Sequence, residues 1–491
     1  MKKTVFITGG TGVMGYAALK KFVDHTDDYE VRAFVRDSEA NHKKMEKFAD
    51  KFQIIWGDLT DYDLISRCME GVDYVLHMGA LINPLATDFP PEVTLRTNYG
   101  STKAMIRGIK QYGQEEKTHL VYIGTVEETG PHFIPHHWGR VGDPLQPPMH
   151  GYYALSKCAA ERAVAESGLK YWVSLRMSFL HPNGPKSGNY PIIGMVTDNN
   201  CAEHIDDESS GNLMLQVCSD AVPEKFWRRG YNIGGGEGLR LTQNQYVEKM
   251  HGNSRDGFKP KWVATRNFHG QFFSDSDLLN ELVPYRLKSA DKFFKDEFKN
   301  MIKGLKSAPK LTPEETLEKN RQICAKPGGT VWAAETGDEE TIRVLFGSVE
   351  KFNAIPDSWD DIPVLTPSHT PTYLDHGFDE TKPQSELNLD DMKKAAEFRG
   401  GKCLSESMVT GDLFTPLKWQ CADGHVFMAT PNLVLNLGHW CPDCLTGKWD
   451  YFHQARVNPF FAQTWDYAHA DEEPYAPVME CDARFVDKEF E

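Results

Sequence analysis

The chain has 491 residues, which predicts two or three domains, and with 40% hydrophobic and 25% charged residues its composition is globular. The formal net charge is −16. No basic patch stands out of the kind that nucleic-acid-binding proteins present to phosphates, so we expect no nucleic-acid partner. No apolar run approaches the roughly 18 residues of a membrane-spanning helix, so we expect no membrane partner.

Cysteine usage indicates the compartment. Of the ten cysteines, the first five stand singly among apolar residues. This distribution is typical of reduced thiols in a cytoplasmic protein. Three of the last five lie near a histidine, in a pattern that favours a metal site over disulfides.

Short apolar runs alternate with amphipathic stretches over about the first 180 residues. The first run follows Met1-Lys2-Lys3 and is interrupted by glycines, so we interpret it as a buried strand rather than a signal peptide. Strands alternating with helices at this spacing predict an α/β fold with a doubly wound parallel sheet of the Rossmann type. The six predicted strands are residues 4–8, 31–35, 53–56, 74–77, 120–123 and 171–177.

A glycine-rich turn follows the first predicted strand and opens a predicted helix. Gly9 can supply the tight turn, Gly12 lets the backbone approach a pyrophosphate, and Gly15 allows the helix to pack closely on the strand. The helix N-terminus behind the turn offers free amides to phosphates. The sequence therefore predicts a dinucleotide site here, whose turn also includes Thr11, Val13 and Met14.

Two further strand ends bear on the cofactor. Arg36 follows the second strand, where an NAD site usually has an acidic residue, and a guanidinium there can pair with a 2′-phosphate. This favours NADP(H) over NAD(H), the alternative being a surface arginine beside Asp37. Asp58 and Leu59 follow the third strand, where the carboxylate can accept from the adenine amine or cap a helix near Thr60.

Tyr153 and Lys157 form a Tyr-x-x-x-Lys pair, which on a helix places both side chains on one face. An ammonium near a phenol lowers the phenol pKa, so the tyrosine can exchange a proton with a carbonyl or carbinol oxygen. The adjacent Tyr152 has Ser156 as its partner four residues on. Thr125 ends the fifth strand and could hydrogen-bond the reacting oxygen.

With these motifs the first 250 or so residues resemble the extended short-chain dehydrogenase/reductase superfamily. The resemblance implies hydride transfer with Thr125, Tyr153 and Lys157 as the catalytic group. It also implies that Asn98 supports the site near the cofactor or the catalytic helix. The residues that carry it are Thr8 to Gly15, Gly57-Asp58-Leu59, His77-Met-Gly79-Ala80, Asn98, Thr125, Tyr153, Lys157, His204-Ile-Asp-Asp207 and Asn232-Ile-Gly-Gly235.

Different segments of the sequence resemble different subfamilies of this superfamily. The segment that contains Arg36 resembles dihydroflavonol-reductase-like enzymes, which use NADPH, and residues 125–131 are similar to 3β-hydroxysteroid dehydrogenases. Sugar-nucleotide 4,6-dehydratases carry a glutamate two residues after the Ser/Thr, where it acts as a base. Glu127 could thus abstract a carbon-bound proton, or it could be a structural carboxylate. The sequence departs from the family at Gly79, which replaces an alanine, and at Thr129, which replaces a tyrosine common in sugar-nucleotide enzymes.

Later segments are less regular. Residues 132–137 contain three histidines, and we interpret them as a surface loop rather than a substrate or metal site. Residues 281–310 have the apolar spacing of a helix. Residues 355–390 are rich in Pro, Asp, Ser and Thr, which predicts a linker or a wrapping segment.

A second motif combines Cys421, His425, Cys441 and Cys444 in two pairs, with glycines where knuckle turns are needed. Four such ligands can hold a tetrahedral zinc ion and replace a hydrophobic core. The segment resembles a zinc ribbon, with Cys403 as a rival for His425. No open coordination position is implied, so we expect a structural zinc in a module that covers the substrate cleft or makes an oligomer contact.

These motifs support one leading functional hypothesis and two alternatives. The leading functional hypothesis is an NADP(H)-dependent oxidoreductase acting on a carbinol or ketone of a small molecule, with a homodimer as the candidate assembly. The alternatives are a sugar-nucleotide epimerase or 4,6-dehydratase with tightly bound NAD, and a non-catalytic NADP(H)-binding sensor or scaffold.

The sequence predicts five parts along the chain. They are residues 1–250, an NAD(P)-binding Rossmann domain with the catalytic residues; 251–355, a substrate-binding helical extension; 356–399, a linker or wrapping segment; 400–447, the zinc-ribbon-like module; and 448–491, an acidic aromatic tail.

Overall fold

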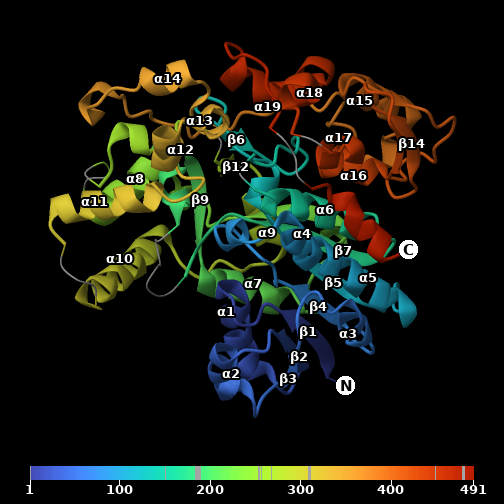
Figure 1. The fold of residues 1–491 in the computed structure, drawn as a ribbon. Helices are drawn as coiled ribbons and strands as arrows, with labels where there is room; N and C mark the ends of the chain where they lie inside the picture. Colours follow the sequence, from blue (N-terminus) through green and yellow to red (C-terminus); the bar gives the residue numbers. More distant parts are fainter. Residues whose placement is uncertain are drawn as a thin grey trace.

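Figure 1 shows the fold in a computed structural model of the chain. The structure describes residues 2–149, 151–182, 190–252, 255, 257–266, 268–307, 311–447, 449–477 and 481–491. In this described part, no helix has both the length and the apolar character that crossing a membrane requires.

A seven-stranded sheet forms the centre of the N-terminal half, in the order β10-β7-β5-β4-β1-β2-β3, and all its neighbouring pairs are parallel. β1 pairs with β2 on one side and with β4 on the other, so the strand order reverses there and leaves a crevice beyond the carboxyl ends of the strands. The doubly wound fold is thus confirmed. Its strands are β1 (Lys3–Thr8), β2 (Tyr29–Val35), β3 (Gln53–Trp56), β4 (Tyr74–His77), β5 (His119–Thr125), β7 (Tyr171–Met177) and β10 (Arg229–Ile233).

Alternating side chains of the strands enter two apolar cores, one on each face of the sheet. Phe6 and Val75 enter one core, whereas Val5 and Ile7 enter the other, and all four are fully buried. Burying each such side chain contributes about 1.5–3 kcal/mol. Helices α1 (Val13–Phe22), α2 (Glu39–Met45) and α7 (Asp207–Val217) cover one face, and α3 (Tyr62–Arg67), α4 (Pro91–Leu95), α5 (Ser101–Gln111) and α6 (Tyr153–Ala165) cover the other.

The middle of the chain adds small sheets and helices beside the carboxyl ends of the strands (Figure 1). The helix expected over residues 281–310 begins later, at Ala290, because Pro284 interrupts the pattern and Val283 and Tyr285 enter the core under the sheet instead. The elements are β6 (Trp138–Gly139), β8 (Phe179–His181), β9 (Cys201–Asp206), β11 (Arg240–Thr242), β12 (Phe272–Phe273), α8 (Gln243–His251), α9 (Ser276–Leu282), α10 (Ala290–Ser307), α11 (Pro313–Cys324), α12 (Thr330–Thr336), α13 (Glu339–Phe346) and α14 (Val349–Asn353).

The histidine-rich stretch is not a surface loop, contrary to the prediction. His132 and His137 are buried, and only His136 is exposed. The His132 ring bonds the carbonyl of Trp138 at 3.1 Å, and that of His137 bonds the carbonyl of Ser368 at 2.9 Å. Backbone carbonyls thus bond one ring nitrogen of His132 and both of His137, and the two histidines pack in the interior.

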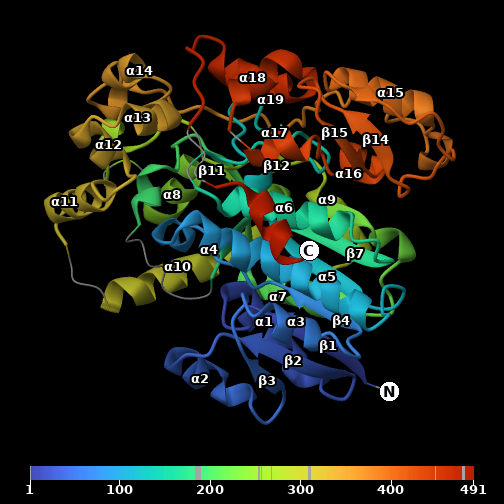
Figure 2. The same ribbon diagram turned by 45° about the vertical axis from the view of Figure 1, so that its right-hand side comes forward.

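The C-terminal part lies against α6 (Figures 1 and 2). Residues 356–388 run mostly without regular structure, whereas a helix occupies most of the last part of the segment 356–399 that was predicted as a linker or wrapping segment. This segment leads into a unit with a three-stranded antiparallel sheet. A 3₁₀ segment at Ala483–Glu489 contacts α4 and α6 near the end of the chain. The elements are α15 (Leu389–Phe398), β13 (Lys402–Cys403), β14 (Leu417–Gln420), β15 (Val426–Ala429), α16 (Pro431–Asn436), α17 (Pro442–Gly447), α18 (Tyr451–Val457) and α19 (Pro459–His469).

Candidate active site and metal centre

The glycine-rich turn between β1 and α1 has the shape that a pyrophosphate site needs. Gly9 has φ +71°, and the Gly12 amide donates to its carbonyl at 2.8 Å. A Cβ on Gly15 would lie only 2.2 Å from the Gly9 oxygen, so a side chain there would push the helix off the strand. Gly12 starts α1 without any side-chain cap, which leaves the first amides of the helix for a phosphate. The turn therefore fits a dinucleotide.

The turn also explains one departure from the family pattern. A Cβ on Gly79 would lie 3.0 Å from the Thr8 hydroxyl oxygen and 3.1 Å from a methyl carbon of Leu59. The Gly79 amide donates to that same hydroxyl at 2.9 Å. Glycine at this position thus lets the loop after β4 close tightly on β1, beside the neighbouring Ala80.

The predicted adenosine contacts lie at the ends of β2 and β3. Arg36 is exposed there. Asp58 is also exposed, and one of its oxygens accepts from the Thr60 amide at 2.9 Å and hydroxyl at 2.7 Å. The cap of helix α3 is Asp61, so the carboxylate of Asp58 stabilises the turn before that helix and keeps its second oxygen for a ligand.

Lys44 lies beside the glycine-rich turn, and the sequence analysis did not single it out. Its ammonium donates to the carbonyl of Thr11, in the glycine-rich turn, at 2.6 Å. Lys44 is on α2, whereas Arg36 lies in the loop before that helix, so no helical spacing connects the two residues in the sequence. The structure thus places the Lys44 ammonium against the glycine-rich turn, while Arg36 follows β2 with an exposed side chain.

The predicted catalytic residues meet at the carboxyl end of β5 and the start of α6. Tyr153 is buried and hydrogen-bonds the side chain of Thr125. Burial raises the pKa of Tyr153, and the neighbouring charge of Glu127 raises it further, whereas the hydrogen bond with Thr125 lowers it. The net shift is thus opposite to the lowering that the sequence analysis expected from the Tyr153–Lys157 pair. Tyr152 turns away instead, since its hydroxyl accepts from the Cys481 amide at 3.2 Å. Tyr153 is therefore the tyrosine that can serve the site.

Lys157 lies one turn further along α6. Its ammonium is 4.3 Å from the centroid of the Tyr122 ring. Burial lowers the pKa of Lys157 to about 8, although the carboxylates of Glu128 and Glu161 oppose this shift. The lysine thus keeps its charge near neutral pH only with the help of these carboxylates.

Glu127 is buried beside Tyr153. One of its oxygens accepts from the Asn83 amide at 2.9 Å, and the other lies 3.6 Å from Nδ1 of His269. Burial raises the pKa of Glu127 to about 8, with the Asn83 hydrogen bond opposing. A carboxyl group with this pKa can accept and return a proton near neutral pH. The sequence analysis missed Asn83 and His269, because only the fold brings them to Glu127.

Asn98 connects the loop after β4 to the catalytic helix. Its side chain bonds the backbone of Leu81 through both polar atoms, at 2.7 and 2.9 Å, and donates to the hydroxyl of Ser156 at 2.8 Å. This placement fits the expectation of a supporting residue. Because the side-chain amide of Asn98 already donates to Leu81 and Ser156, a direct contact with the cofactor would have to share one of these donors.

The second predicted site gathers Cys421, His425, Cys441 and Cys444, whose donor atoms all lie within 4.8 Å of one another. The sulfurs of Cys421 and Cys444 are 3.8 Å apart. Two thiolates on one zinc ion, each about 2.3 Å from it, stand about 3.8 Å apart in a tetrahedral site, so the donor set fits zinc. Cys403 pairs with Trp419 in the small sheet and is outside the group.

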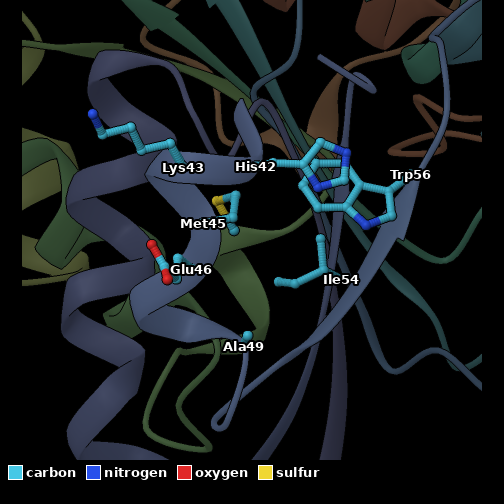
Figure 3. A pocket seen from close by; sticks show the side chains of 7 residues that line it. All are labelled: His42, Lys43, Met45, Glu46, Ala49, Ile54 and Trp56. Carbon is cyan, nitrogen blue, oxygen red and sulfur yellow. The ribbon is translucent and has the colours of Figure 1, made fainter. Parts of the chain in front are cut away.

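A separate cavity of about 380 Å³ lies between α2 and the edge strand β3 (Figure 3). The imidazole of His42 stacks on the indole of Trp56, with ring centroids 3.8 Å apart. The ring of His42 also contacts Asp37 at 2.8 Å, in the loop that carries Arg36. The lining residues are His42, Lys43, Met45, Glu46, Ala49, Ile54 and Trp56, none of which the sequence analysis singled out.

Comparison with known proteins identifies the class. Residues 5–190 match the model of the NAD dependent epimerase/dehydratase family. The match covers the N-terminal region of the chain and confirms the predicted resemblance to the extended short-chain dehydrogenase/reductase superfamily.

Among curated relatives, the UDP-glucose 4-epimerase of Rickettsia canadensis (strain McKiel) is 34% identical over 113 residues, which are 22% of this chain and 33% of that protein. The UDP-glucose 4-epimerase of Rickettsia felis is 39% identical over 104 residues, or 20% and 29% of the two chains. The chain thus spans about a third of the length of these relatives.

Solved structures resemble this one over a larger share of the chain. A dTDP-glucose 4,6-dehydratase from Bacillus anthracis in complex with NAD has 16% identity and a TM-score of 0.48, over 62% of this chain and 98% of that one. The UDP-Glc/GlcNAc 4-epimerase of Campylobacter jejuni has 16% identity and a TM-score of 0.48, over 61% and 99%.

Proposed function

We propose that the protein is an NAD(P)-dependent enzyme of the epimerase/dehydratase type, which oxidises a carbinol of a sugar-nucleotide-like small molecule and reduces the product again within one turnover. The observation that carries this proposal is the buried group of Thr125, Tyr153 and Glu127, in which a hydrogen-bonded tyrosine stands beside a carboxyl group. The names of the curated relatives support the same class.

The bound cofactor would supply the hydride acceptor and donor. Tyr153 takes the proton of the substrate carbinol as its carbon loses hydride and returns it when hydride comes back. Thr125 holds the same oxygen by hydrogen bonding. The ammonium of Lys157 stabilises the phenolate form of Tyr153 that this step needs.

Glu127 gives the site a capacity beyond epimerisation at the carbinol carbon. A ketone at that carbon acidifies the neighbouring C–H, and the Glu127 carboxylate can accept this proton. The hydroxyl on the next carbon then leaves and takes up a proton to become water. Hydride would return from the bound cofactor to that carbon, and a proton would return to the carbon that Glu127 deprotonated, which completes the dehydratase reaction. Within the proposed class, Glu127 therefore favours a dehydratase over a 4-epimerase.

A second candidate is a reductase with dissociable NADP(H), the function that Arg36 and Lys44 favour. A cation beside the glycine-rich turn and another after β2 suit a 2′-phosphate. In this case the enzyme would exchange its cofactor in every turnover and need no tightly held nucleotide.

One experiment separates the candidates. The purified chain is denatured and the released nucleotide is assayed, while intact protein is titrated with NAD, NADH, NADP and NADPH. Retained NAD would support the epimerase/dehydratase function. An empty site with preference for NADPH would support the reductase. Binding of NADPH without turnover of any carbonyl or sugar-nucleotide substrate would leave only a sensor or scaffold.

The role of Glu127 is tested by solvent isotope exchange. If Glu127 moves a carbon-bound proton, turnover in D₂O places deuterium on the carbon next to the carbinol, and Glu127→Gln abolishes this incorporation while hydride transfer to the cofactor continues. Equal deuterium incorporation by Glu127→Gln would make Glu127 a structural carboxylate.

A further inference from the structure

A buried polar network joins the C-terminal module to the back of the catalytic helix. Its centre is Glu161, one turn after Lys157 on α6. The carboxylate of Glu161 accepts from the Ser174 hydroxyl at 2.5 Å, and it pairs with Arg176 at 2.6 Å and with Nε2 of His439 at 2.9 Å. Glu161 and Arg176 are fully buried, and His439 is 1% exposed. His439 belongs to the module, two residues before Cys441.

The network continues to the catalytic threonine. Arg176 also pairs with Glu128 at 3.3 Å, and the other oxygen of Glu128 accepts from the backbone amide of Thr125 at 2.8 Å. The carbonyl of Leu437, again in the module, accepts from Arg176 at 2.8 Å. A continuous chain of hydrogen bonds and ion pairs thus links the module to the residue that hydrogen-bonds Tyr153.

The metal donors can hold the module end of this chain. Cys441 is one of the four donors, and the carbonyl of the preceding Trp440 accepts from Arg162 of α6 at 3.0 Å. Residues 437–441 therefore join the metal group to α6 within a few residues. A zinc ion on the four donors would fix this segment against the helix.

The same network determines which charged groups surround the Lys157 ammonium. The groups that face its ammonium are Glu128 and Glu161, the buried His77 and the Tyr122 ring. The two glutamates favour the charged lysine, and Arg176 lies between them and pairs with both. Burial and the charge of Glu161 raise the pKa of Glu128 well above its ordinary value, whereas Arg176 holds the pKa of Glu161 below its ordinary value despite burial. A charge left without its partner in the interior is strongly destabilising, so the network is held as a unit.

We propose that the C-terminal module is a working part of the catalytic centre, in which His439 and Glu161 act as positioning residues for Thr125 and Lys157. The module thereby has a role in addition to its own folding. The effect on turnover rests on the proposed function, whereas the structural coupling does not.

The coupling is tested first by hydrogen–deuterium exchange on the full chain, with zinc bound and after chelation. We expect chelation to speed exchange about tenfold not only in residues 400–447 but also in residues 119–129 and 153–165, because buried hydrogen bonds across the interface are lost. Faster exchange confined to residues 400–447 would overturn the proposal, whatever the enzyme's substrate is.

Variants in α6 test the coupling with the metal still bound. Glu161→Gln leaves all four metal donors intact, so zinc content stays the same, yet exchange in residues 119–129 should rise. Glu166→Gln is the matched control. Glu166 is the C-cap of the same helix and also contacts the module, through the Thr430 hydroxyl at 2.6 Å, but it is not part of the network. Equal exchange patterns in the two variants would contradict the proposal.

Turnover provides a readout that a purely structural role would not move. Removing the Glu161 charge lowers the pKa of Lys157, so the alkaline limb of kcat/KM should shift by about one pH unit to lower pH in Glu161→Gln. Glu161→Asp, which keeps the charge, should restore the limb, and Glu166→Gln should leave it unchanged. An unshifted limb in Glu161→Gln, with turnover present, would refute the role at Lys157. If no substrate is turned over, the exchange experiment still decides the coupling.

Discussion

The N-terminal sheet and the C-terminal module are stabilised in different ways. In the sheet, strands such as β1 bury consecutive apolar side chains on both faces, and Val5, Phe6 and Ile7 are fully buried. In the module the strands have only two to four residues, and its buried apolar side chains join the core on one face of the sheet, beside four candidate metal donors and a buried ionic network. The first region is thus held mainly by hydrophobic burial, whereas the second combines such burial with groups that must be paired.

Metal removal should have the largest effect and should separate the two regions. In small zinc modules the binding free energy, about 10–16 kcal/mol, is also the folding free energy. We expect Cys441→Ser combined with Cys444→Ser to lose the bound zinc and to make residues 400–447 sensitive to protease, while the sheet stays folded. Zinc content by mass spectrometry and limited proteolysis measure this.

Cys403→Ser is the control for metal removal. Cys403 lies outside the donor group, so this variant should keep one zinc per chain and the wild-type proteolysis pattern. Loss of zinc from Cys403→Ser, or full zinc content in the double variant, would show that the donor set is wrong.

The second largest effect is expected from a substitution in the candidate active site, which lies in the N-terminal sheet region. Tyr153→Phe should reduce turnover by about 10²- to 10⁴-fold, because the proton of the carbinol loses its acceptor, while the affinity for the cofactor is retained. Tyr152→Phe is the control, since that hydroxyl contacts only the chain near Cys481 among the contacts described. Near-normal turnover by Tyr153→Phe would remove Tyr153 from the mechanism.

The sequence predicted the sheet better than it predicted the contacts between regions. Six strands follow from apolar runs, but β10 was missed because its polar Arg229 and Gly230 interrupt the apolar pattern. The four metal donors follow from their spacing. The buried state of His137 does not, because its ring bonds Ser368, which is 231 residues away in the sequence. Asn83, His269 and Glu161 likewise acquire their roles from partners that only the fold supplies.

A smaller effect concerns the cofactor end of the sheet. Arg36→Ala and Lys44→Ala should each weaken NADPH binding about tenfold, because each removes one cation from the site of the 2′-phosphate, and should leave NADH binding nearly unchanged. Calorimetric titration measures both affinities. Lys43→Ala is the control, since Lys43 lines the cavity between α2 and β3 instead. Equal losses for NADH and NADPH would show that these residues do not recognise the 2′-phosphate.

The smallest effect concerns a contact between the wrapping segment and the loop after β6. His376 is buried, with Nε2 2.9 Å from Asp143 and Nδ1 3.1 Å from Glu380. Burial alone would lower the pKa of His376, but the hydrogen bonds with these two carboxylates and the charge of Asp143 raise it above its ordinary value, with Arg140 nearby opposing. The protonated ring therefore pairs with two carboxylates.

Because the folded state raises the pKa of His376, its contribution to the free energy of unfolding is complete below the ordinary histidine pKa of about 6.5 and is lost as pH rises through the folded value. We expect the difference in unfolding free energy between wild type and His376→Gln to be about 1 kcal/mol at low pH and to shrink as pH rises above neutral. Urea unfolding across this range measures it. A difference that grows with pH would mean that the ring pairs in its neutral form, and that the wrapping segment is held by packing rather than by charge.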